Sequence, residues 1–124
     1  MERTGIFVGS FDPFTIGHAS VVRRALPLFD RLVIGVGVNA GKRYMTSTED
    51  RVAAISRLYA DDSRVKVEAY TGLTVDFAER HGAKFIVKGV RSVRDFEFER
   101  EQADINRRLT GVETVLLYAE PGLD

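Results

Sequence analysis

The sequence contains no cysteine, only two histidines and no excess of charge of either sign. Without cysteine, the chain can form no disulfide framework, thiolate zinc site or catalytic thiol. Its 18 basic and 18 acidic side chains give a formal net charge of zero. That balance argues against a nucleic-acid partner bound through bulk charge, although a local basic cluster remains possible.

Long apolar segments are also missing. No run approaches the length that spans a membrane, and the N-terminal "MERTGIFVGS" lacks the apolar core of a signal peptide. We therefore expect no membrane partner and a cytoplasmic location. The 124 residues, 44% hydrophobic and 29% charged, suit one globular domain over 1–124.

Short β-rich segments alternate with segments of helical periodicity along the chain. The predicted strands are 5–9, 31–38, 64–70, 84–89 and 113–119. The predicted helices follow the first loop at 19–29 and then cover 48–60, 74–82 and 94–109. Such alternation predicts an α/β fold, a Rossmann-like doubly wound five-stranded parallel sheet with helices on both faces.

Two helices need comment. In 48–60, Val52, Ile55 and Tyr59 fall on one face, and Ser47 or Thr48 can be the N-cap. The segment 94–109 begins with "DFEFE", which alternates like a strand. Over its full length, however, the apolar spacing is helical, so we predict a helix.

The segments richest in unusual chemistry follow the predicted strands. They are "GSFDPFTIGH" after the first, "NAGKRYM" after the second, "TGLT" after the third and "KGVRSVRD" after the fourth. Parallel α/β sheets bind ligands at these carboxyl ends, near a topological switch point.

The first of these loops has the composition of an anion-binding turn. Gly9 and Ser10 allow a close backbone turn, and amide groups at a helix N-terminus favour an anion. If His18 lies at the start of that helix, its ring can donate a hydrogen bond to a phosphate. The alternative is a plain connector in which Asp12 and Thr15 satisfy loop amides and the histidine is merely packed.

Cations follow the second and fourth strands. Lys42 and Arg43 occupy a glycine-containing loop that can close over phosphates, or they are solvated surface charges. Lys88, Arg91 and Arg94 can grip phosphates through charge-assisted hydrogen bonds. Alternatively, they form a self-contained ion-pair network with the acids that follow them, which are Asp95, Glu97 and Glu99.

Other phosphate-site signatures are missing. There is no Walker A string, "GVGVNAG" is too loose for a dinucleotide fingerprint, and no carboxylate pair has an obvious acid/base spacing. The residues indicate phosphate chemistry carried out by positioning and charge, without a covalent nucleophile.

The motifs "GSFDPFTIGH", "TGLTVDFA" and "KGVRSVRDFEFE" resemble one family. The first contains the [HT]-x-G-H signature of the nucleotidyltransferase superfamily as Thr15-Ile16-Gly17-His18. Together the three resemble the bacterial phosphopantetheine adenylyltransferase family, in register from Thr4 to about Tyr118. The resemblance implies transfer of AMP from ATP to 4′-phosphopantetheine, giving dephospho-coenzyme A and pyrophosphate in the penultimate step of coenzyme A synthesis.

The resemblance also implies roles for particular residues. His18, Lys42 and Arg91 would be catalytic: His18 stabilises the transition state on the ATP phosphates, and Lys42 bridges the acceptor phosphate and the α-phosphate. Implied ATP contacts are Ser10, Phe11, His18, Gly89, Val90, Arg91 and Glu99. Implied contacts to phosphopantetheine are Ser10, Lys42, Leu73, Thr74 and Lys88.

The resemblance further implies Mg²⁺ held mainly by phosphate oxygens, with no protein metal ligands, and a homohexamer. Two departures stand out. Lys88 occupies the place of a common arginine, which exchanges a planar fork for a point charge. The sequence stops at "YAEPGLD", so we expect the chain to lack the family's C-terminal segment, which carries a serine-rich stretch and terminal helices.

Three other functions remain open at this point. A nicotinate or nicotinamide mononucleotide adenylyltransferase usually has histidine where Thr15 stands and asparagine where Asp12 stands. A cytidylyltransferase would show "FDLLH" in place of "FDPFT". A non-catalytic nucleotide-binding module would bind ATP without releasing pyrophosphate.

Overall fold

The computed structural model describes residues 2–39 and 41–122 and contains one five-stranded parallel sheet in the order β3-β2-β1-β4-β5. The strands are β1 (Thr4–Gly9), β2 (Arg31–Gly37), β3 (Val65–Tyr70), β4 (Phe85–Val90) and β5 (Glu113–Tyr118). The helices are α1 (Ile16–Ala25), the 3-10 turn η1 (Leu26–Leu28), α2 (Thr48–Leu58), α3 (Thr74–Arg80) and α4 (Val93–Thr110). The predicted α/β fold and each predicted strand are confirmed, with bounds that shift by at most one residue.

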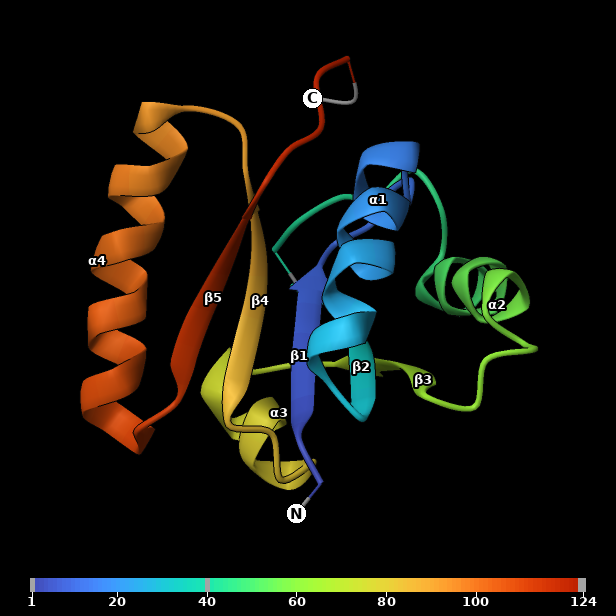
Figure 1. Cartoon of the computed structure of the whole chain (residues 1–124). Helices are drawn as coiled ribbons and strands as arrows, with labels where there is room; N and C mark the ends of the chain where they lie inside the picture. Colours follow the sequence, from blue (N-terminus) through green and yellow to red (C-terminus); the bar gives the residue numbers. More distant parts are fainter. Residues whose placement is uncertain (1, 40, 123–124) are drawn as a thin grey trace.

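The order of the strands creates one switch point. From β1 the chain builds outward through β2 to β3, and it then crosses back to place β4 on the other side of β1. The connections that leave β1 and β4 therefore diverge at neighbouring strand ends, where open α/β sheets form a crevice. In Figure 1, α2 stands near one end of the sheet and α4 near the other, beside β5.

Each face of the sheet has its own apolar core. On one face, α1 and α2 pack through Val22 and Ile55 against Phe7 and Ile34 of the central strands. On the opposite face, Phe77 and Ala78 of α3 pack against Ile6 and Val33. The predicted face of α2 is confirmed, because Ile55 is buried and its neighbours Val52 and Tyr59 pack on the same core.

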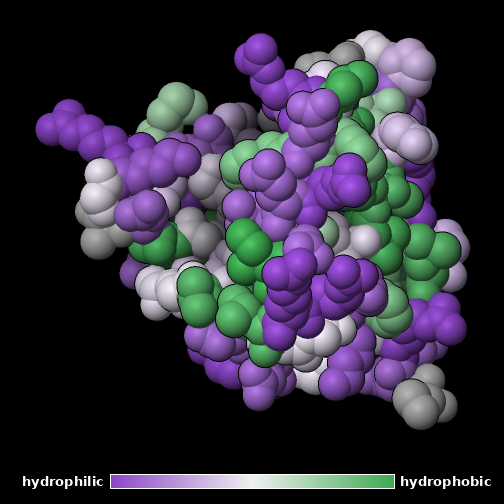
Figure 2. Space-filling model, turned by 90° about the vertical axis from the view of Figure 1, so that its left-hand side faces the viewer, coloured by the Kyte–Doolittle hydropathy of each residue, from purple (hydrophilic) through white to green (hydrophobic). Residues whose placement is uncertain are grey.

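The helix α4 is the exception, because it contributes no buried residue despite its 18 residues. It lies at the edge of the sheet beside β5. Its large apolar side chains are exposed, and they include Phe96, Phe98, Ile105 and Leu109. Figure 2, which views the molecule from this side, shows hydrophobic patches between hydrophilic ones. The predicted helix is confirmed, but in this chain its apolar face is uncovered.

No helix among the described residues has the length and apolar composition needed to cross a lipid bilayer.

Gly35 of β2 is required by close packing. A Cβ added there would lie 2.6 Å from Cε2 of Phe77 and 3.0 Å from Cγ1 of Val8. Phe77 is itself fully buried and stacks on Tyr70 with ring centroids 4.4 Å apart, so its ring has little room to move. The absence of a side chain at Gly35 is what lets Phe77 of α3 pack this closely against β2.

We expect Gly35→Ala to lower the free energy of unfolding by about 1–3 kcal/mol, the usual cost of overpacking a filled core. Chemical denaturation monitored by circular dichroism measures the change. Gly41→Ala is the matched control, because its Cβ would meet nothing nearer than Asn39 Oδ1 at 3.6 Å. Equal stability of the two variants would contradict this account of the packing.

Candidate functional site

A cavity of about 690 Å³ lies at the switch point, where the carboxyl ends of β1 and β4 meet the start of α1. Its walls come from the turn after β1, the first turn of α1, the end of β4 and the side of α4 that carries Asp95 and Glu99. The residues lining it include Ser10, Phe11, Asp12, Thr15, Gly17, His18, Lys88, Gly89, Arg91, Asp95, Glu99 and Ala119.

The turn after β1 is held by an aromatic cluster. Phe11 has a positive φ of 48° and is buried, so its ring is directed inward beneath the turn. It packs edge-on against His18, with ring centroids 5.0 Å apart, and against Phe14 at 5.2 Å. A left-handed backbone is uncommon for a bulky residue and persists only where the surroundings enforce it. Burial of the Phe11 ring provides that enforcement.

Thr15 and His18 cap the start of α1 reciprocally. The Thr15 hydroxyl accepts a hydrogen bond from the His18 backbone N–H at 3.3 Å, and the His18 ring accepts one from the Thr15 N–H at Nδ1, at 2.9 Å. Because Nδ1 accepts a hydrogen bond, the neutral ring carries its proton on Nε2. The ring is therefore a hydrogen-bond donor at the cavity wall.

Two features keep this ring neutral. Burial lowers the pKa of His18 below its ordinary value of 6.5, and the positive charge of Arg91 lowers the pKa further. Both effects disfavour a second proton while no anion is bound. At neutral pH, His18 is therefore an uncharged donor in an electropositive corner.

Two cations at the end of β4, Lys88 and Arg91, are held by acids from α4. Arg91 is anchored by Asp95, whose Oδ2 accepts from the Arg91 backbone N–H at 3.1 Å and from its Nε at 3.2 Å. Among the described residues, the Arg91 Nη groups have no such partner and stay available to an anion. The Lys88 ammonium lies 3.6 Å from Oε1 of Glu99. Two pairs of the alternative ion-pair network are therefore present, and both line the cavity. In the part of the chain that the structure describes, Arg94 and Glu97 form no such pair and lie outside the lining.

The segment 41–47, which carries Lys42, is tied to the same turn. Asp12 accepts hydrogen bonds from the backbone N–H groups of Met45 at 2.5 Å and Thr46 at 3.1 Å. Asp12 therefore satisfies loop amides, as in the connector alternative, but the amides belong to a loop more than thirty positions away. It joins the loops after β1 and β2.

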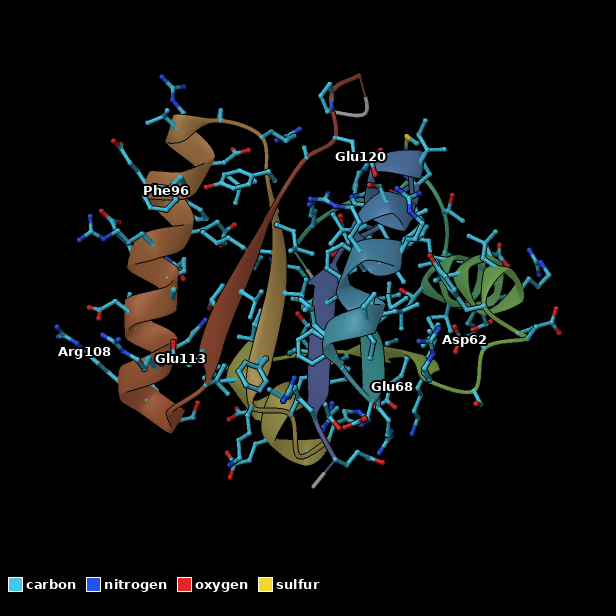
Figure 3. The ribbon with its side chains drawn as sticks, in the orientation of Figure 1. Asp62, Glu68, Phe96, Arg108, Glu113 and Glu120 are labelled. Carbon is cyan, nitrogen blue, oxygen red and sulfur yellow. The ribbon has the colours of Figure 1, made fainter. Side chains whose placement is uncertain are left out.

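The segment after β5 contributes Ala119 to the cavity wall. Glu120 accepts a hydrogen bond from Ser20 Oγ at 2.6 Å and pairs with Arg23, so the segment after β5 lies against α1. Figure 3 shows Glu120 beside the upper part of α1. This contact keeps Ala119 at the cavity wall.

The structure brings together most, but not all, of the residues singled out from the sequence. Those lining the cavity are Ser10, Phe11, His18, Lys88, Gly89, Arg91 and Glu99. Lys42 is exposed and lies outside the lining, with its ammonium 5.8 Å from the centre of the Tyr44 ring. Val90 is buried in the sheet, and Thr74 bonds to the Tyr70 hydroxyl at 3.1 Å beyond the cavity.

Sequence reasoning missed Arg51, a buried side chain of α2 that donates to the Ser10 carbonyl at 2.6 Å. One signal could have found it. Arg51 stands four positions before Ile55, on the face of α2 that packs against the sheet. An arginine on such a face must find acceptors inside the molecule.

Comparisons with known proteins agree with this geometry. The family model described as "Cytidylyltransferase-like" matches residues 6–120. Among solved structures, a bifunctional NMN adenylyltransferase/ADP ribose pyrophosphatase from Francisella tularensis has a TM-score of 0.75 at 16% identity, covering all of this chain and 40% of that one. A lipopolysaccharide core biosynthesis protein from Thermoplasma volcanium has a TM-score of 0.68 at 20% identity, covering 97% and 98%. At these identities, the likeness shows the fold alone.

Curated relatives are much more similar. The phosphopantetheine adenylyltransferase of Phocaeicola vulgatus is 58% identical over 121 residues, which are 98% of this chain and 80% of that protein. The enzyme of the same name from Bacteroides fragilis is 54% identical over 121 residues, 98% of this chain and 81% of that protein. The resemblance found in the three sequence motifs is thereby confirmed, and the chain belongs to the phosphopantetheine adenylyltransferase family.

Proposed function

We propose that this chain transfers the adenylyl group of ATP to the phosphate of 4′-phosphopantetheine through the cavity between β1 and β4. The observation that supports this most is the meeting of a neutral histidine donor, two cations and the start of α1 around one cavity. The products are dephospho-coenzyme A and pyrophosphate, and we propose that the reaction takes place in the cytoplasm.

The reaction requires positioning more than proton transfer. An oxygen of the acceptor phosphate attacks the α-phosphorus of ATP, a new P–O bond forms, and the bond to the β-phosphate breaks as pyrophosphate leaves. The nucleophile is already an anion, so no strong base is needed. Alignment of the two phosphates and cancellation of the charge that builds on the equatorial oxygens lower the barrier.

His18 meets the second requirement. Its Nε2–H donates to a non-bridging oxygen of the α-phosphate, while the Thr15 N–H holds the opposite nitrogen. The backbone N–H groups of Ile16 and Gly17 at the start of α1 add partial positive charge on the same side. Ser10 and Phe11 form the neighbouring wall, which carries the adenylyl group.

Different cations bind the phosphates of ATP and the phosphate of the acceptor. Arg91 binds the ATP phosphates through the Nη groups that Asp95 leaves available. Lys88 holds the acceptor phosphate, and Glu99 keeps the ammonium in place. Lys42 approaches the two reacting phosphates from the segment 41–47, while Gly89 and Val90 supply backbone at the end of β4. The pantetheine arm extends out of the cavity toward Leu73 and Thr74.

Mg²⁺ fits this site as an ion carried by the nucleotide. No group of three or more His, Cys, Asp or Glu side chains in residues 2–39 and 41–122 is arranged to hold a metal. The carboxylates of Asp12, Asp95 and Glu99 line the cavity but already face N–H or ammonium groups. Phosphate oxygens and water would therefore coordinate the ion, which supplies further positive charge at the reacting phosphates.

A homohexamer would also suit the exposed apolar side chains of α4, which include Phe96, Phe98, Ile105 and Leu109. We expect light scattering coupled to size exclusion to give a mass six times that of one chain. A monomeric mass at micromolar concentration would contradict this assembly.

We expect His18→Ala to lower kcat by on the order of 10²–10³, as for loss of one donor that stabilises developing charge. Mass spectrometry of dephospho-coenzyme A formed from ATP, Mg²⁺ and 4′-phosphopantetheine measures the rate. His81→Ala is the matched control, because this second histidine lies at the end of α3, outside the cavity, and pairs there with Glu68 of β3. A folded His18→Ala protein with wild-type turnover would refute the role.

The ring of His18 should show the Nε2–H tautomer and a pKa below 6.5 in nitrogen-15 spectra recorded across pH. ATP should raise that pKa, because phosphate charge favours the imidazolium. Because the pKa of His18 is lowered in the folded chain, that chain binds the second proton of the imidazolium less tightly than the unfolded chain does. Stability linked to His18 should therefore decline as the pH falls from 6.5 through the folded pKa. An Nδ1–H tautomer would contradict the capping geometry.

A further inference from the structure

We infer that Arg51 is a positioning residue that holds Lys42 in register with the phosphate-binding turn, acting through Tyr44. The inference rests on the proposed role of Lys42 at the reacting phosphates. It concerns a residue of α2 that does not line the cavity.

Arg51 joins two loops that are far apart in the sequence. Its side chain is buried, with 3% of its surface exposed. Its guanidinium donates from Nη1 to the Ser10 carbonyl at 2.6 Å, and from Nε to the Thr46 carbonyl at 3.1 Å. Nη2 donates to the Thr48 hydroxyl at 3.0 Å. One rigid planar group thus fixes the turn after β1 relative to the segment after β2.

The guanidinium also reaches toward Lys42. Its central carbon lies 4.1 Å from the centre of the Tyr44 ring, and the Lys42 ammonium lies 5.8 Å from the same centre. The Tyr44 hydroxyl accepts a hydrogen bond from the Asn39 N–H at 2.8 Å, which fixes the other side of the segment. The Tyr44 ring is therefore a spacer that the buried cation and the exposed cation both approach.

The cost of burying Arg51 indicates a role beyond packing. Within residues 2–39 and 41–122, no carboxylate forms an ion pair with it, and its acceptors are carbonyl and hydroxyl oxygens. A buried cation without a carboxylate is expensive, and an apolar side chain of similar volume would fill the space at lower cost. The guanidinium makes contacts that an apolar side chain cannot, and these contacts set the relative position of two loops.

Asp12 supports the same arrangement from the other side. It accepts from the N–H of Thr46, whose carbonyl accepts from Arg51. The backbone N–H and the carbonyl of Thr46 are thus both bound to side chains. Asp12 belongs to the phosphate-binding turn, and Arg51 contacts it. Together these bonds restrict how the segment can move relative to Ser10.

Placement of this kind matters for a reaction that depends on alignment. A displacement of about 1 Å in a positioned group can lower the rate by on the order of 10²-fold. Lysine at position 51 would keep the charge but lose the planar fork, so it cannot reach all three acceptors. We expect Arg51→Lys to lower kcat at least about tenfold and to change the KM for ATP much less.

A double-mutant cycle tests the inference. Arg51→Lys, Lys42→Ala and the double variant are assayed for dephospho-coenzyme A formation, with Arg57→Lys as the control at an exposed position of the same helix. If Arg51 acts through Lys42, Arg51→Lys should add little to the loss already caused by Lys42→Ala. Equal losses in both backgrounds would overturn the inference while leaving the role of Lys42 intact. Wild-type turnover of Lys42→Ala would overturn both.

A second measurement does not depend on turnover. Trypsin cleaves after Lys42 and Arg43, and mass spectrometry gives the rate at these bonds. We expect Arg51→Lys to accelerate this cleavage several-fold and Arg57→Lys to leave it unchanged. Tyr44→Leu, which removes the spacer ring, should reproduce the effect even if position 51 tolerates no substitution. Unchanged cleavage in folded Arg51→Lys or Tyr44→Leu would overturn the inference.

Discussion

The reciprocal bonding between Thr15 and His18 is the interaction on which the site depends. It begins α1, because each residue satisfies a backbone donor of the other. It also sets the chemistry, because a ring that accepts at Nδ1 must donate from Nε2. Folding of the helix start and presentation of the donor are therefore one event. Any change that weakened the cap would also misplace the donor.

The charges around the cavity follow a common arrangement. Two cations at the end of β4 are paired with acids from α4, Lys88 with Glu99 and Arg91 with Asp95. The pairs hold long side chains near the cavity before any substrate arrives, which reduces the entropy lost on binding. An anion that entered the cavity would therefore meet cations that are already ordered. The sequence left open whether these residues bind phosphate or each other, and the structure shows that pairing and exposure to the cavity coexist.

Local patterns explain why the fold was predictable. Alternating strands, the periodicity of 48–60 and the cap residue at Ser47 are encoded within a few positions, and each agrees with the structure. The convergence of the first and fourth loops also followed from the rule for parallel sheets. The exposure of α4 did not, because its spacing shows an apolar face but not what covers it. Nor did the place of Lys42, Thr74 and Val90 outside the cavity, which depends on three-dimensional reach.

Arg51 shows where local reasoning ends and what lies beyond it. Its bond to Ser10 spans 41 positions, so neither residue indicates the other in the sequence. The same helix that buries Ile55 in the core carries, one turn earlier, the group that joins the loops after β1 and β2. Packing of α2 against the sheet therefore fixes the position of Arg51. Arg51 in turn fixes the position of the Tyr44 ring and, through it, that of Lys42. In this family member, the hydrophobic core sets the position of a cation that never enters it.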